Sequence, residues 1–277
     1  MRSLRRPAAV LAALALTASL AGCSLFDQKA TEPASTSMVM PEARAVGVDA
    51  KTDNGRIFIV QDPSVGEAIV SAEAKLVNVD RAERFSIETT LGDDGTLVVR
   101  PLWPDGKRQG NEKCSFEITI PTLHGVVANS SNGSITIKGG SGTVELKTSN
   151  GAITIEDRVG DVRARTSNGR IQVARASGAF DLETSNGAVS INSGSPALGA
   201  PYDWRVSSSN GSIRIDLDQP LDARLRASTS NGKARVERIS GGDGSSTIVS
   251  GKSIEVDGSR GNITIDTSNG SITIRTP

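Results

Sequence analysis

Residues 128–173 read ANSSNGSITIKGGSGTVELKTSNGAITIEDRVGDVRARTSNGRIQV, and this stretch decides the fold. It holds three copies of Ser-Asn-Gly, and four more follow it. The spacings between the seven asparagines are 18, 18, 18, 24, 21 and 38 residues. Self-similarity at a nearly fixed period of this size indicates a repeat architecture. The asparagines are Asn132, Asn150, Asn168, Asn186, Asn210, Asn231 and Asn269.

Apolar residues fall into columns at fixed distances from these asparagines. Each column alternates with polar residues, as in a strand with one buried face. Three residues after the asparagines come Ile135, Ile153, Ile171, Val189, Ile213, Ala234 and Ile272. Six residues before them come Val126, Val144, Val162, Phe180, Trp204, Leu225 and Ile263. Each repeat therefore predicts two short strands.

Two all-β architectures can bury such columns. Asn-Gly is typical of two-residue hairpins, which would give an antiparallel meander. Because the columns keep the same residue types through all copies, they favour a single-stranded parallel β-helix, or solenoid, with about 18 residues per coil. In that architecture equivalent residues stack about 4.8 Å apart, so the asparagines form a structural turn ladder in the interior of one bend. Glycines mark the other bend: Gly142, Gly160, Gly178 and Gly261.

The solenoid is expected to cover residues 46–277 as one domain. Residues 122–277 form the regular Ser-Asn-Gly coils, and a degenerate copy over residues 249–256 makes an additional coil in the long last gap. Residues 46–121 repeat the motif once, at Asn54 and Gly55, and otherwise read as longer, less regular strands. Solenoid ends expose unpaired backbone, so we expect these strands to cap the first coil.

The N-terminus has the layout of an export signal. Arginines precede an apolar run too short to span a bilayer. The run ends in Leu20, Ala21, Gly22 and Cys23, which resembles the lipobox of bacterial lipoproteins. The resemblance implies that residues 1–22 are a lipoprotein signal peptide and that Cys23 carries the lipid. An ordinary signal peptide is the alternative. Residues 23–45 would then be the lipidated cysteine and a flexible tether on an exported envelope protein, and Ser24 favours the outer membrane in a diderm cell.

Composition argues against several functions. Lysine plus arginine number 31, against 31 aspartate plus glutamate, and this balance argues against nucleic acid as a partner. One His, one Tyr and two Cys leave few residues for acid-base or nucleophilic chemistry, so we expect no enzyme and no cofactor. The acidic pairs Glu156–Asp157 and Asp216–Asp218 lack the ligand count of a calcium loop, so no metal is expected.

Two irregular loops are the candidate binding sites. One presents Trp103 beside Lys107 and Arg108, and the other, an insertion before Asn210, contains Tyr202. Insertions in repeat proteins map to loops on one face, where binding residues gather. Trp103 could instead plug the end of the core. An outward column of alternating charge is a binding face or a solvated surface: Glu145, Arg163, Asp181, Arg205 and Arg226.

The segments FEITIP, ANSSNGSITI, ELKTSNGAITI and RARTSNGRIQV together resemble the bacterial "putative adhesin" domain of unknown function, a family of exported β-solenoid proteins. The resemblance runs from about residue 46 to 275 and implies a right-handed helix. It carries no catalytic residues. The function expected is a non-enzymatic, lipid-anchored envelope protein for adhesion or for binding an envelope polysaccharide or protein. Its oligomeric state is left open. The alternatives are an envelope signalling or stress accessory that accepts a partner strand by β-augmentation, and a polysaccharide-acting enzyme.

Overall fold

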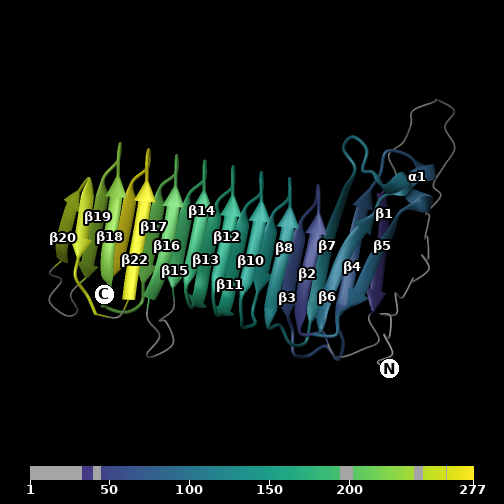
Figure 1. The fold of residues 1–277 in the computed structure, drawn as a ribbon, viewed down its shortest axis with the longest axis horizontal. Coiled ribbons are helices and arrows are strands. Elements are labelled where there is room, and N and C mark those ends of the chain that lie inside the picture. The colour runs from purple at the N-terminus through teal and green to yellow at the C-terminus, as the bar shows by residue number, and fades with distance from the viewer. Residues whose placement is uncertain (1–32, 40–44, 194–201, 240–245, 260) are drawn as a thin grey trace, which may run out of the picture.

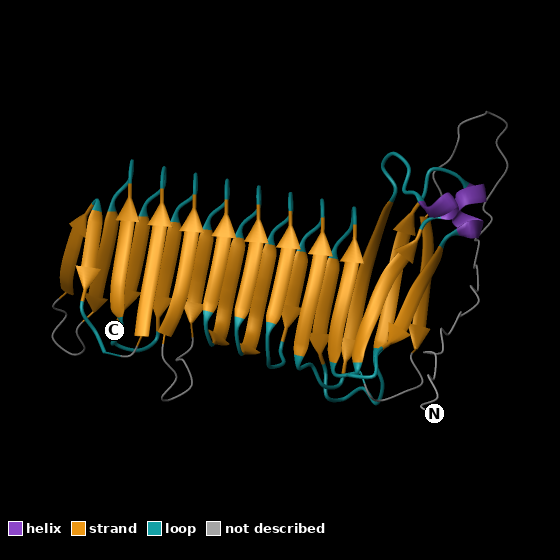
Figure 2. Ribbon diagram, viewed as in Figure 1, coloured by secondary structure: helices purple, strands orange, loops and turns teal. Residues whose placement is uncertain are grey.

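The computed structural model describes residues 33–39, 45–193, 202–239, 246–259 and 261–277. These residues form two long sheets that enclose one hydrophobic core along the whole rod (Figures 1 and 2). Within the described ranges, helical structure is confined to α1 (Val79–Arg84) and a single 3-10 turn, Pro104–Gly106. The chain is therefore all-β, as the sequence predicts.

The first sheet has twelve strands. In spatial order they are β1 (Pro33–Val39), β4 (Ile69–Lys75), β7 (Lys113–Ile120), β3 (Ile57–Gln61), β9 (Ile135–Lys138), β11 (Ile153–Val159), β13 (Ile171–Ser177), β15 (Val189–Ser193), β17 (Ile213–Leu217), β23 (Ile272–Thr276), β19 (Ala234–Ile239) and β20 (Ser246–Gly251).

The second sheet has eleven strands. In spatial order from the opposite end they are β21 (Ser253–Val256), β18 (Arg224–Thr229), β22 (Gly261–Thr267), β16 (Tyr202–Ser208), β14 (Phe180–Thr184), β12 (Val162–Thr166), β10 (Val144–Thr148), β8 (Gly125–Ser130), β2 (Gly47–Thr52), β6 (Thr96–Leu102) and β5 (Ser86–Leu91).

Most neighbouring strands are parallel and in register by equivalent residues. Ile153 pairs with Ile135 on one side and with Ile171 on the other, so the same side chain recurs in adjacent strands. In the regular part of the chain, consecutive strands lie in alternate sheets. We call two consecutive strands, one in each sheet, a coil. Parallel pairing rules out the antiparallel meander. Antiparallel pairs occur only at the two ends, where β1, β4 and β5 close one end and β20 and β21 close the other.

The predicted apolar columns form the core. Ile135, Ile153 and Ile171 are completely buried, and Phe180 stacks on Trp204 with 4.8 Å between ring centroids. The Trp204 Nε1 also donates to the carbonyl oxygen of Gly178 at 2.9 Å. Burial of these columns holds the two sheets together.

The order of the coils differs from the order of the sequence at both ends. The coil β2–β3 lies between β6–β7 and β8–β9, and the last coil, β22–β23, lies between β16–β17 and β18–β19. The degenerate copy over residues 249–256 is not a coil, contrary to expectation. It contributes to β20 and β21, which run antiparallel to β19 and β18 and form the outer edge of each sheet.

The position of the last coil separates side chains of like charge. Stacking in sequence order would place like charges side by side, which is unfavourable across neighbouring strands. The last coil separates three such pairs: Arg205 and Arg226 by Thr264, Arg214 and Arg235 by Thr273, and Asp216 and Glu237 by Arg275. Arg275 additionally forms an ion pair with Glu237 at 2.9 Å.

The bend marked by glycines requires them for conformational reasons. The four glycines of this bend have φ between +78° and +137°, a backbone conformation that residues with a Cβ rarely adopt. They are Gly142, Gly160, Gly178 and Gly261. Nearby, the buried side chain of Arg158 donates to the Gly139 carbonyl oxygen at 2.9 Å and also to that of Ser141. Burial lowers the pKa of this guanidinium to about 10.

Part of the expected tether is a strand. β1 covers residues 33–39, inside the segment expected to be flexible from 23 to 45, and it pairs antiparallel with β4 along its full length. It covers the edge that β4 would otherwise expose, which explains why a strand forms there.

Replacing Ile153 by alanine tests whether the columns hold the fold. We expect a loss of about 2–5 kcal/mol in the free energy of unfolding, because the change removes buried methyl groups and leaves a cavity. Denaturant unfolding measures it. The control is Thr154→Ala, whose side chain points outward on the same strand; equal losses for the two variants would contradict the assigned core.

Candidate functional site

The turn asparagines form one continuous ladder of side-chain amides. Each Nδ2 donates to the Oδ1 of the asparagine in the next coil towards the N-terminal end, and the ladder follows the spatial order of the coils. The bonds run from Asn231 to Asn269 (2.7 Å), Asn269 to Asn210 (2.7 Å), Asn210 to Asn186 (2.8 Å), Asn186 to Asn168 (2.8 Å), Asn168 to Asn150 (2.7 Å), Asn150 to Asn132 (2.6 Å) and Asn132 to Asn54 (2.5 Å).

The ladder lies on the outside of the turn, not in its interior as expected. The glycine that follows each asparagine occupies the interior instead. A Cβ on Gly151 would lie 2.0 Å from the carbonyl oxygen of Gly133, so only glycine fits there. The Asn132 and Asn150 side chains are exposed. A row of primary amides therefore faces solvent along the rod.

A second ladder, inside the turn, was not anticipated. Thr148 Oγ1 donates to the Gly133 carbonyl oxygen at 2.9 Å, and the residue two positions before the other asparagines does the same to the glycine of the neighbouring coil. The set is Ser130, Thr166, Thr184, Ser208, Thr229 and Thr267. The sequence feature that could have predicted this inner ladder is the serine or threonine that recurs two positions before each asparagine.

Thr166→Val tests the inner ladder. Valine keeps the shape of the buried side chain but leaves the Gly151 carbonyl oxygen without its donor, so we expect a loss of about 1–3 kcal/mol in unfolding free energy. Ser167→Ala, an exposed neighbour in the same turn, is the control and should change stability by about 0.5 kcal/mol or less. A neutral Thr166→Val would show that this hydrogen bond does not hold the turn.

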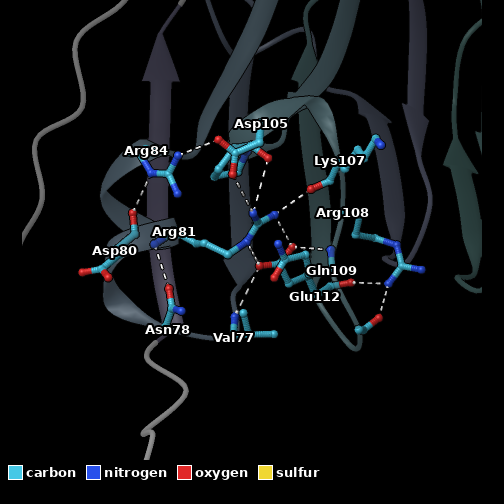
Figure 3. A network of polar contacts seen from close by, with 12 residues as sticks. Val77, Asn78, Asp80, Arg81, Arg84, Asp105, Lys107, Arg108, Gln109 and Glu112 are labelled. Atoms are coloured by element: carbon cyan, nitrogen blue, oxygen red, sulfur yellow. Dashed lines mark hydrogen bonds and ion pairs between the residues drawn. The ribbon is translucent and has the colours of Figure 1, made fainter.

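The asparagine ladder ends at Asn54, because the next coil, β6–β7, has a long loop over residues 103–112 in place of Ser-Asn-Gly. A buried ion pair holds this loop against α1 (Figure 3). Arg81 Nε lies 2.6 Å from Glu112 Oε1, and Arg81 Nη2 lies 2.9 Å from Glu112 Oε2. Arg81 also donates to the carbonyl oxygens of Pro104 and Lys107, and the Gln109 amide donates to Glu112.

Two opposing effects act on the pKa of Glu112. Burial raises it, but the hydrogen bonds from Arg81 and from the backbone amides of Gln109 and Val77 lower it, and the outcome is a pKa below the ordinary 4.5. A carboxyl whose pKa is lowered on folding stabilises the protein above its unfolded pKa and loses that contribution as the pH falls through the folded pKa. The loop is therefore held most firmly at neutral pH and loosens in acid.

Glu112→Gln removes this charge and leaves Arg81 buried without its carboxylate, which costs about 3–5 kcal/mol. We expect faster hydrogen exchange of the amides in residues 104–112 at pH 7, and a smaller further increase on acidification than in the unmodified protein. Asp105→Asn is the control, because its carboxylate is exposed and lies 3.5 Å from Arg81. Exchange unaffected by Glu112→Gln would contradict this role of the ion pair.

The candidate residues of this loop have different surroundings. Trp103 is half-buried and packs on Phe85, with 5.1 Å between ring centroids, and its Nε1 finds no hydrogen-bond partner within the described part of the chain. It thus packs against the core, as in the alternative in which Trp103 plugs the end of the core. Lys107 is exposed. The Arg108 guanidinium donates to the carbonyl oxygens of Gly110 and Glu112.

The other predicted site residues cannot be placed as fully. Tyr202 begins β16, and its Cα pairs with that of Gly261. Most of the insertion before it, residues 194–201, lies outside the described residues. Leu20, Ala21, Gly22 and Cys23 also lie outside them.

A groove of about 480 Å³ lies where the asparagine ladder ends. We call it the ladder-end groove. Nine described residues line it, and none of them is acidic: Asn54, Gly55, Arg56, Asn111, Lys113, Ser115, Asn132, Gly133 and Ser134. Arg56 and Lys113 are exposed. Two cations and several amides and hydroxyls thus offer hydrogen-bond donors without a competing carboxylate, which suits a ligand rich in acceptor oxygens.

A second groove, of about 310 Å³, follows the charged column of the second sheet. Four carboxylates line it, and arginines pair with one of them, Asp181. Arg163 lies 3.2 Å and Arg165 3.1 Å from Asp181. Arg205 and Arg226, adjacent in the expected column, are separated by Thr264. Within the described residues no three His, Cys, Asp or Glu side chains group to hold a metal ion.

Comparison with known proteins identifies the fold. No protein-family model matches the chain, and no curated protein matches its sequence. A crystal structure from Bacteroides fragilis, described as "a putative adhesin", superposes with a TM-score of 0.50 at 16% identity, covering 90% of this chain and 100% of that one. This chain shares its fold. The likeness agrees with the fold expected from the family resemblance.

Two further crystal structures cover a similar share of the chain but superpose with lower TM-scores. One from Parabacteroides distasonis, described as a "putative lipid binding protein", has a TM-score of 0.41 at 15% identity and covers 87% of this chain and 96% of its own. One from Clostridium sporogenes, described as a "putative cell adhesion protein", has a TM-score of 0.28 at 12% identity and covers 89% and 100%. In the described ranges, no helix has the length and hydrophobicity that crossing a bilayer requires.

Proposed function

We propose that this protein is a non-enzymatic, lipid-anchored protein of the cell envelope, a right-handed β-solenoid of about 18 residues per coil that binds an envelope component. The ladder-end groove carries the proposal, because Arg56 and Lys113 converge there with exposed amides and without a carboxylate. The adhesin description of the Bacteroides fragilis protein with the same fold supports a binding role.

The ligand that best fits this groove is an acidic polysaccharide. Its carboxylates would pair with the two cations, and its hydroxyl oxygens would accept from the amides of Asn54, Asn111 and Asn132. The ladder continues beyond the groove with amides that recur once per coil, about 4.8 Å apart. An extended chain could therefore lie along several coils, and each contact would add to the affinity.

The groove on the second sheet gives little support to the enzyme alternative. A glycoside hydrolase needs two carboxyl groups free to act as acid and as base or nucleophile. Asp181 is held by two arginines, and Asp161 accepts a hydrogen bond from the Ala179 amide at 3.1 Å. Two of the four carboxylates that line this groove are therefore already engaged within the sheet.

The double variant Arg56→Ser with Lys113→Ser tests the proposed site. Binding of the Cys23→Ala chain to polygalacturonate, measured by calorimetry at low salt, should weaken at least tenfold in the double variant, because both cations are lost. Neutral dextran should bind more weakly than polygalacturonate, and added salt should weaken the binding of polygalacturonate. The chain must retain residues 33–39, since β1 covers the edge of β4.

Arg170→Ser with Lys147→Ser is the matched control. Arg170 occupies the same position in its turn as Arg56, two residues after the asparagine, but neither control residue lines the ladder-end groove. The control has the same net charge as the test variant, so it reports the general electrostatic effect. Equal weakening in both double variants would overturn the assignment of the site, and no binding to any acidic glycan would overturn this ligand class.

A further inference from the structure

The chain enters the folded body beside α1. Pro33, the first described residue, pairs with Lys75 at the end of β4, four residues before Val79 begins α1. Figure 1 shows β1 and α1 at the same end of the rod. Whatever holds the chain before residue 33 therefore holds this end of the molecule.

The segment between Cys23 and β1 is short. Nine residues, 24–32, separate them, and even a fully extended chain spans only about 35 Å between Cys23 and Pro33. Twelve strands about 4.8 Å apart make the first sheet about 50 Å long. A lipid on Cys23 would thus confine the α1 end near the bilayer, whereas the β20–β21 end could stand well away from it.

Exposed apolar side chains gather at the same end. The described residues include four large hydrophobics with 40% or more of their surface exposed, and two of these are Val79 (47%) and Leu102 (42%). Leu102 pairs across β5 and β6 with Ser86, two residues after α1 ends. Neither side chain has a role in the core.

The segments next to these two residues carry an excess of basic side chains. Segments 75–84 and 103–113 carry six basic and four acidic residues, in a chain whose net charge is zero. Two ion pairs join the segments: the buried Arg81–Glu112 pair fixes the loop to α1, and the exposed Arg84 lies 2.8 Å from Asp105. Four basic and two acidic side chains remain outside these pairs. Apolar side chains flanked by exposed cations are typical of proteins that rest on a lipid surface.

We propose that a membrane-facing cap, defined as Val79, Leu102, Lys75 and Lys107, rests on the bilayer that holds the Cys23 lipid, and that the β-rod projects from it. The inference depends on the proposed lipid anchor. Two apolar residues and a small excess of charge bind a bilayer weakly on their own, and the lipid makes the contact effective by confining the cap near the surface. The ladder-end groove then lies at the membrane-proximal part of the rod.

Site-specific labelling can test this orientation. Cys114 is completely buried, and burial raises its pKa to about 12, so it resists thiol reagents. A cysteine introduced at another position in the acylated protein is then the one that reacts. We would label Val79→Cys, Leu102→Cys, Lys147→Cys and Ser253→Cys with a fluorophore, reconstitute each in vesicles of phosphatidylethanolamine and phosphatidylglycerol, and measure quenching by a headgroup nitroxide.

The expected result is quenching at residues 79 and 102 that is at least threefold stronger than at residue 147, in the middle of the rod, or at residue 253, at its far end. Equal quenching at all four positions in vesicle-bound protein would overturn the orientation, and so would stronger quenching at 253. Flotation with the vesicles, lost in Cys23→Ala, reports the anchor separately. Protein that does not float would refute the proposed anchor and this inference with it.

A second measurement avoids labelling the cap residues themselves. With the fluorophore at Gln109→Cys, quenching should fall at least twofold when Val79 and Leu102 are changed to serine. The matched control changes Val127 and Val159 to serine, since these are the other two exposed hydrophobics and lie in β8 and β11. Equal effects of the two double variants would overturn the cap.

Discussion

The close contact between the glycines of neighbouring turns is the constraint on which the rest of the structure depends. The carbonyl oxygen of Gly133 occupies the place where a Cβ of Gly151 would lie, so the coils can approach to the spacing of a parallel sheet only when this position has no side chain. Thr148 then bonds that same carbonyl oxygen from inside, and Asn150 is left to bond Asn132 from outside. One small residue thereby sets the register of both strands that follow and precede it.

The regular coils were predictable because each one repeats the same local rule. Alternation around Ile153 and Ile171 predicts strands, inward faces and parallel stacking, and the structure has all three. The asparagine ladder was expected on the wrong side of the turn, since the pattern alone does not show that the glycine fills the interior. The inner row of hydroxyls was visible as a column but had no assigned role.

The ends were not predictable from periodicity, because their coils are stacked out of sequence order. In the structure, Arg275 lies between Asp216 and Glu237, which stand at equivalent positions in consecutive repeats. The ladder-end groove was missed for a related reason. Arg56 and Lys113 are far apart in sequence and meet only because β3 pairs with β7. Trp103, chosen for its aromatic ring, instead covers the core with Phe85.

The position of β22–β23 also governs when the protein can finish folding. These residues leave the ribosome after the strands of the two coils between which they lie. Until they arrive, β16–β17 and β18–β19 have no neighbour on their facing edges, and the β20–β21 cap has no settled place. Contacts between distant parts of a chain form slowly. Completion of this part of the rod therefore waits for β22–β23. A chain that stops before these strands presents open sheet edges, which distinguish it from the complete rod.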